Sequence, residues 1–127
     1  MKLVFTLTSL LLASQSSFAV TFAGAGENLL YFEYAKQSAD YCEIRSASAR
    51  HLFTDWNQKN AHLYQQSIEA IRVEAKQRGL NGGEQDVVVS EAIENQRKLA
   101  KENIAKKGVP CEKFGPWLNG FSSFLKQ

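Results

Sequence analysis

The two cysteines of this chain, Cys42 and Cys111, constrain its fold more than any other feature. They lie about 70 residues apart, which excludes the C-x-x-C redox motif and the short patterns of zinc ligands. Two cysteines in an oxidising compartment leave one possible pairing. In the chain-entropy model, closing a loop of this length stabilises the native state by about 4.4 kcal/mol. We therefore predict a disulfide that joins the first and last helices.

Residues 1–19 have the three parts of a secretory signal peptide, which places the protein in such a compartment. A charged start at Lys2 is followed by a mostly apolar stretch from Leu3 to Ala13, and Ser17-Phe18-Ala19 is a small-x-small cleavage site. The apolar stretch is shorter than the roughly 20 residues that cross a bilayer. We expect a periplasmic or secreted protein with no transmembrane segment once the signal is removed.

Residues 20–127 have the length of one domain, and their charge is nearly balanced. The formal net charge of the whole chain is +2, to which Lys2 of the signal contributes. Nucleic-acid binding needs a strongly basic face, so the composition gives it no support. We predict a single helical domain over residues 20–127 that binds no nucleic acid.

Apolar periodicity predicts four helices, over residues 36–58, 60–78, 84–107 and 110–126. In the second, Asn60 has the position of an N-cap and Gly79 that of a left-handed stop. The sequence thus predicts an all-α fold, a small four-helix domain stapled by one disulfide. The apolar stripe of the second helix, at steps of three and four, is made of Ala61, Tyr64, Ile68, Ile71 and Ala75.

Both cysteines are expected on apolar helix faces. Cys42 shares a face of the first predicted helix with Ala49, Phe53 and Trp56. We therefore expect the first and last helices to lie side by side, with a kink or a fresh helix start at Gly115-Pro116. The last helix carries the stripe Cys111, Phe114, Leu118, Phe121 and Leu125.

The segment before residue 36 gives weaker signals. Val20 to Gly26 is small and glycine-bearing, so we expect a loose N-terminal arm. Residues 29–35 have more apolar bulk than one helix face can hide. We expect these residues to be buried in the core, and the alternative is that they form an exposed patch that binds a partner.

No catalytic or metal-binding constellation is evident, and we predict that the protein is not an enzyme and has no cofactor or metal. The two histidines, His51 and His62, lie too far apart on one straight helix to share a metal ion. His51 and Asp55 are four residues apart and could pair for proton transfer, but this spacing is more often a surface contact.

A stable fold without catalytic residues must act through its surface, so the leading hypothesis is a binding module of the cell envelope. Such a protein would bind an extracytoplasmic protein partner in an inhibitor, immunity or chaperone-like role. The alternative is a carrier of a small apolar ligand in a pocket lined by Phe53, Trp56, Tyr64 and Phe121. An enzyme built on His51 and Asp55 comes third. The expected partner-binding residues are Tyr31, Phe32, Tyr34, Trp117 and Phe124.

Overall fold

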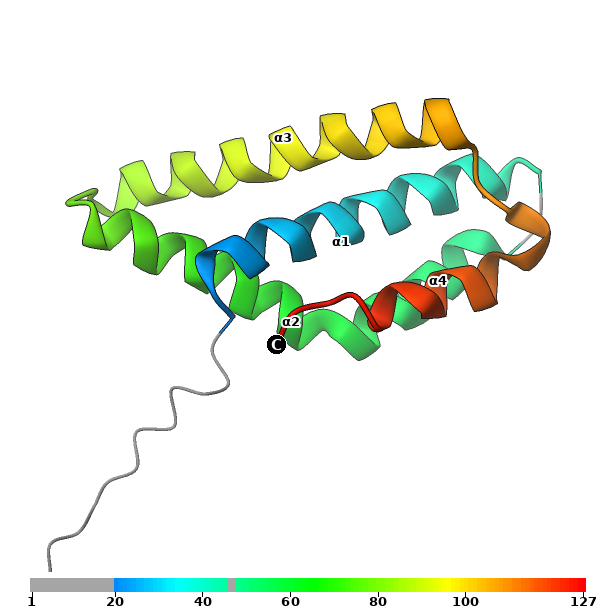
Figure 1. Ribbon diagram of the computed structural model, residues 1–127, viewed down its shortest axis with the longest axis horizontal. Helices are drawn as coiled ribbons and strands as arrows, with labels where there is room; N and C mark the ends of the chain where they lie inside the picture. Colours follow the sequence, from blue (N-terminus) through cyan, green and yellow to red (C-terminus); the bar gives the residue numbers. More distant parts are fainter. Residues whose placement is uncertain (1–19, 46–47) are drawn as a thin grey trace, which may run out of the picture.

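The computed structural model describes residues 20–45 and 48–127, which form helices joined by short connections (Figure 1). The all-α, four-helix prediction is confirmed, and the described residues contain no strand. The predicted signal peptide, residues 1–19, lies outside the described residues. In chain order the elements are α1 (Phe22–Glu43), α2 (Ala49–Gln77), α3 (Gly82–Lys107), the 3-10 turn η2 (Cys111–Lys113) and α4 (Phe114–Ser122).

Helix α1 is the centre of the fold, because each of the other three α-helices packs against it. Helices α3 and α4 lie on opposite sides of α1, and α2 contacts all three (Figure 1). The expectation that the first and last helices lie side by side is therefore correct. Two clusters of buried side chains follow from this arrangement, one shared by α1, α2 and the C-terminal segment and one shared by α1, α2 and α3.

The expected loose arm at Val20 to Gly26 is wrong, because α1 already begins at Phe22. Thr21 caps the helix, its Oγ1 accepting a hydrogen bond of 3.0 Å from the backbone N–H of Gly24. Gly24 allows the C-terminal segment to cross the first turn closely, since a Cβ atom there would lie 3.1 Å from Cβ of Lys126. The small residues thus serve close packing rather than mobility.

The predicted helix over 36–58 is wrong, because α1 ends at Glu43 and α2 begins at Ala49. Ser48 has a positive φ of 77°, which an α-helix cannot include. A hydrogen bond connects the end of α1 to the start of α2, since Oε2 of Glu43 accepts a bond of 2.9 Å from the backbone N–H of Arg50. Cys42 and Trp56 therefore belong to different helices, although both are buried as expected.

The predicted break before Asn60 does not exist, and α2 continues through it to Gln77. Asn60 does not cap a helix, because its Nδ2 donates to the carbonyl of Trp56 one turn earlier, at 2.8 Å. The end of α2 agrees with expectation, since Gly79 has a φ of 87°.

Helix α3 begins at Gly82, two residues before the predicted start. Asn81 and Glu84 form a capping box, with bonds of 2.9 and 3.1 Å between each side chain and the other's backbone N–H. The helix ends at Lys107, as predicted, and Gly108 follows with a φ of 67°.

The last predicted helix, 110–126, is instead a 3-10 turn followed by the shorter helix α4. The fresh start comes at Phe114, so that Pro116 lies in the first turn of α4, where a missing N–H removes no hydrogen bond. Three side chains of this segment, Phe114, Leu118 and Leu125, are buried. Each such burial contributes about 2 kcal/mol, which keeps α4 docked.

Candidate functional site

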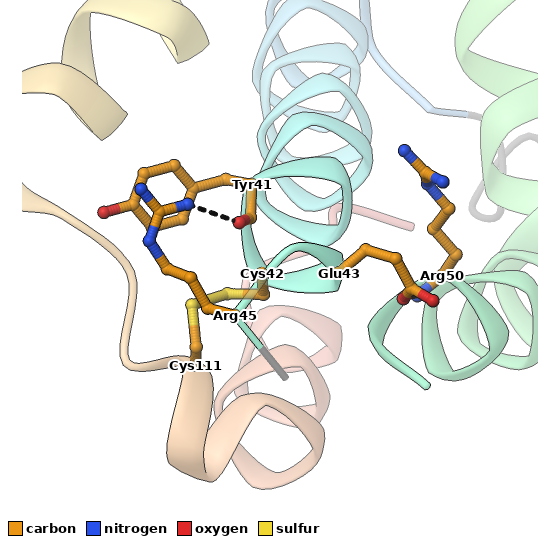
Figure 2. The surroundings of a disulfide bond; sticks show 6 residues. All are labelled: Tyr41, Cys42, Glu43, Arg45, Arg50 and Cys111. Atoms are coloured by element: carbon orange, nitrogen blue, oxygen red, sulfur yellow. Dashed lines mark hydrogen bonds between the residues drawn. A yellow bond between two sulfur atoms is a disulfide. The ribbon is translucent and has the colours of Figure 1, made fainter. Parts of the chain in front are cut away.

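The disulfide fixes the C-terminal segment on α1. Cys42, fully buried near the end of α1, bonds to Cys111 at the start of η2, with a Cα–Cα distance of 5.2 Å (Figure 2). Cys111 is partly exposed. The predicted link between the first and the last helix is confirmed.

Charged groups lie on both sides of this bond. The Arg45 guanidinium is stacked over the ring of Tyr41, with Cζ 3.7 Å from the ring centroid, and its Nη1 donates a hydrogen bond of 2.7 Å to the Tyr41 carbonyl (Figure 2). Glu43 points to the opposite side, toward Arg50. The end of α1 is thus fixed by polar contacts as well as by the disulfide.

Five aromatic rings of α1 and the C-terminal segment form a continuous cluster, called here the aromatic surface. Trp117 and Phe121 are in closest contact, with ring centroids 4.5 Å apart. Tyr34 lies 5.6 Å from Trp117 and 5.4 Å from Phe121, and Tyr31 lies 5.3 Å from Phe121. These separations are typical of favourable aromatic pairs. The aromatic surface consists of Tyr31, Tyr34, Trp117, Phe121 and Phe124.

The aromatic surface remains open to solvent. Phe124 is 54% exposed and stacks on Tyr31 with an interplanar angle of 15°, and the other four rings are partly exposed. Phe32 has a different position from the one expected of a binding residue, since it is 4% exposed and packs on Trp56 and Tyr64 in the core. Residues 29–35 are therefore core on one side and surface on the other.

A buried polar clamp holds the C-terminal end against α1, and no sequence pattern predicted it. Asn28 is fully buried, its Nδ2 donating to Ser67 Oγ at 3.0 Å and to the Lys126 carbonyl at 2.9 Å. Its Oδ1 accepts a hydrogen bond of 2.7 Å from the Lys126 N–H. Trp56 adds a further bond, from Nε1 to Ser122 Oγ at 3.0 Å. These contacts place Phe121 and Phe124 against Tyr31.

A groove between α1 and α2 lies apart from the aromatic surface. It has a volume of about 340 Å³. Two residues that we expected in a ligand pocket, Phe53 and Tyr64, line it, whereas Trp56 is buried and Phe121 belongs to the aromatic surface. The complete lining is Phe32, Glu33, Lys36, Phe53, Asn57, Ala61, Tyr64 and Gln65.

Burial raises the pKa of two tyrosines in these regions. Tyr34 of the aromatic surface has a raised pKa because its phenol is partly desolvated. For Tyr64, in the groove, desolvation is the largest cause, the nearby negative charge of Glu33 adds to it, and Arg97 opposes it. Both phenols therefore stay protonated to a higher pH than a free tyrosine does.

The candidate catalytic pair lies in the open. His51 Nε2 is 3.5 Å from Asp55 Oδ2, and both side chains are exposed on α2, although Asp55 also lines a small pocket of about 130 Å³ against α4. His62 is exposed as well. Among residues 20–45 and 48–127, no group of three or more metal-ligating side chains comes together.

Comparison with known proteins adds no functional information. No protein-family model, curated protein or solved structure matches the chain. In the part of the chain that the structure describes, no helix combines the length and apolar character needed to cross a membrane.

Proposed function

We propose that this protein is a binding module that attaches to a protein partner outside the cytoplasm through the aromatic surface. The observation that carries the proposal is the cluster of five partly exposed rings in mutual contact across α1 and the C-terminal segment. Tyr, Trp and Phe are enriched in the centres of protein interfaces and supply much of their binding energy. An inhibitor, immunity or chaperone-like role would use such a contact.

The rigidity of the site supports the proposal further. The disulfide fixes one end of the C-terminal segment, and the bonds of Asn28 to Lys126 fix the other. The rings between these anchors therefore lose little conformational freedom when a partner binds, which favours affinity. A disulfide is also compatible with an oxidising compartment, in agreement with the predicted signal peptide.

A capture experiment with matched variants tests the proposal. The mature protein is immobilised and exposed to envelope extract, and any retained protein is identified by mass spectrometry, purified and titrated by calorimetry. Phe124→Asp places a charge on the aromatic surface, and Leu99→Asp does the same at a comparably exposed apolar position, 43% exposed, on α3. We expect one partner to be retained by the wild type and by Leu99→Asp and to be lost with Phe124→Asp.

Two results would contradict the proposal. In the first, no protein is retained above background. In the second, the retained protein binds the wild type and both variants with equal affinity, which would place its contact elsewhere. Circular dichroism of each variant checks that Phe124→Asp acts on the surface and not on the fold.

A further inference from the structure

The groove between α1 and α2 is lined by a largely buried carboxylate whose charged partner is a single arginine. Glu33 is 7% exposed and lines the groove. No described residue donates a hydrogen bond to it, and its ion-pair partner is Arg97, whose Nε lies 3.6 Å from Oε2. A carboxylate has about four acceptor sites, and burying it without donors is costly. The Glu33 carboxylate therefore has acceptor sites that water or a bound ligand can occupy.

Two positively charged side chains, Arg97 and Lys36, lie near Glu33. Arg97 makes its close contact elsewhere, with Nη1 2.7 Å from Glu94 Oε2, so it compensates Glu33 only in part. Lys36 also lines the groove, but its side chain is exposed and water screens its charge. Of the two charged side chains that line the groove, Glu33 is therefore the more buried and the less screened by water.

The rest of the groove suits an apolar body with few polar substituents. Phe53 and Tyr64, both partly exposed, provide aromatic walls, and a small part of the buried Phe32 also lines the groove. The side chains of Asn57, Tyr64 and Gln65 line the groove and form no hydrogen bond with another described residue, so their polar groups can bind a ligand. A volume of about 340 Å³ is at the lower end of the range for small-molecule sites.

We propose that this groove binds a small organic amine, with the ammonium group on Glu33 and an aromatic or alkyl body against Phe32, Phe53 and Tyr64. The ammonium donates charge-assisted hydrogen bonds to the carboxylate, which are stronger than neutral ones. The aromatic walls attract the cation as well as the apolar body. The site is separate from the aromatic surface, so it is a second binding function and does not depend on the first. It also refines the expected apolar ligand to one with a cationic head.

The test uses three probes of one size and different charge. The mature protein is titrated with 2-phenylethylammonium, the neutral 2-phenylethanol and the anionic phenylacetate, with binding followed by amide chemical shifts. We expect saturable binding of the cation, with the largest shifts at the groove residues, and weaker binding of the other two probes. Absence of saturable binding, or equal or tighter binding of the alcohol or the anion, would overturn the proposal.

Two variants with matched controls locate the site. Glu33→Gln is expected to weaken binding of the cation at least about tenfold, because a charged hydrogen bond is replaced by a neutral one. The control Glu91→Gln, on the exposed face of α3, is expected to bind as the wild type does. Unchanged affinity in Glu33→Gln would overturn the proposal.

A second variant keeps the test decisive if Glu33→Gln fails to fold. Ala61 is exposed on the α2 wall of the groove, so Ala61→Trp fills the groove without entering the core. Its control is Ala105→Trp, at an exposed position of α3. We expect Ala61→Trp to abolish binding of 2-phenylethylammonium and Ala105→Trp to retain it. Retention of binding in Ala61→Trp would place the ligand elsewhere.

Discussion

The clamp of Asn28 on the C-terminal end is expected to contribute a large part of the stability of the fold. The replacement Asn28→Leu keeps the volume of the side chain and removes three hydrogen bonds, one to Ser67 Oγ and two to the backbone of Lys126. Each is worth about 1 kcal/mol net, so the free energy of unfolding is expected to fall by about 3 kcal/mol. For a domain of this size, the melting temperature then falls by roughly 10–15 °C.

The assay is urea-induced unfolding of the oxidised protein, followed by circular dichroism. The matched control is Asn95→Leu, an exposed asparagine of α3 whose side chain makes no hydrogen bond to a described residue, and its effect is expected to stay within about 0.5 kcal/mol. Ser67→Ala alone and combined with Asn28→Leu completes a double-mutant cycle, in which we expect a coupling of about 1 kcal/mol.

Hydrogen exchange provides an independent readout of the same bonds. The Lys126 amide donates to Asn28 Oδ1, so it is expected to exchange slowly in the wild type and fast in Asn28→Leu. If the Lys126 amide exchanges equally fast in both proteins and the urea midpoints coincide, the clamp does not form in solution. The assignment of the C-terminal end to α1 would then be refuted.

Two further predictions concern the disulfide and alkaline pH. Replacing Cys42 and Cys111 by serine is expected to lower the free energy of unfolding by about 4 kcal/mol, and a urea midpoint equal to that of the oxidised wild type would contradict this. The raised pKa of Tyr64 means that the folded protein holds this proton more tightly than the unfolded chain. Its stabilising contribution is therefore complete below about pH 10 and is lost as the pH rises beyond it. Urea midpoints between about pH 9 and 11 are expected to fall less steeply in Tyr64→Phe than in the wild type, and equal slopes would refute the reasoning.

The parts of the fold that were predicted correctly depend on local patterns. The end of α3 was predicted from Lys106 and Lys107, which precede Gly108. The end of α2 was predicted from Gly79, which has the expected left-handed backbone. The burial of Phe114 and Leu118 on α4 follows from their helical spacing. Leu125, predicted on the same stripe, is buried although it lies beyond the end of α4, and Cys111 and Phe121 are only partly buried. Such signals lie within a few residues of the feature they determine.

The parts that were missed depend on contacts between distant residues. The connection between α1 and α2 contains neither Gly nor Pro, so no local signal marked the break after Glu43. Asn28 and Lys126 pair across nearly the whole domain, and nothing near either residue indicates the other. Asn28 follows Glu27 directly and stands before the apolar run that begins at Leu29, so its local sequence does not distinguish it from an exposed polar residue.

Which aromatic rings are exposed also depends on contacts between helices that are distant in the sequence. Phe32 and Tyr34 are both aromatic residues of the cluster 29–35, and both were expected to bind a partner. Phe32, however, packs on Trp56 in the core, and Tyr34 stays at the surface beside Trp117. The difference depends on where α2 and α4 lie against α1, since Trp56 belongs to α2 and Trp117 to α4. Apolar spacing does not determine these positions. The proposed binding surface and the groove could therefore be separated only once the helices were placed.

The covalent link between α1 and η2 has a mechanical consequence. The sulfur bridge closes residues 42–111 into a ring that contains α2 and α3. A pulling force applied at the two ends of the domain travels from α1 through the bridge to α4 and never loads the ring. An unfoldase that threads polypeptide through a narrow pore as one strand would meet a doubled chain at Cys111, so the oxidised protein is expected to resist such threading until the bridge is reduced.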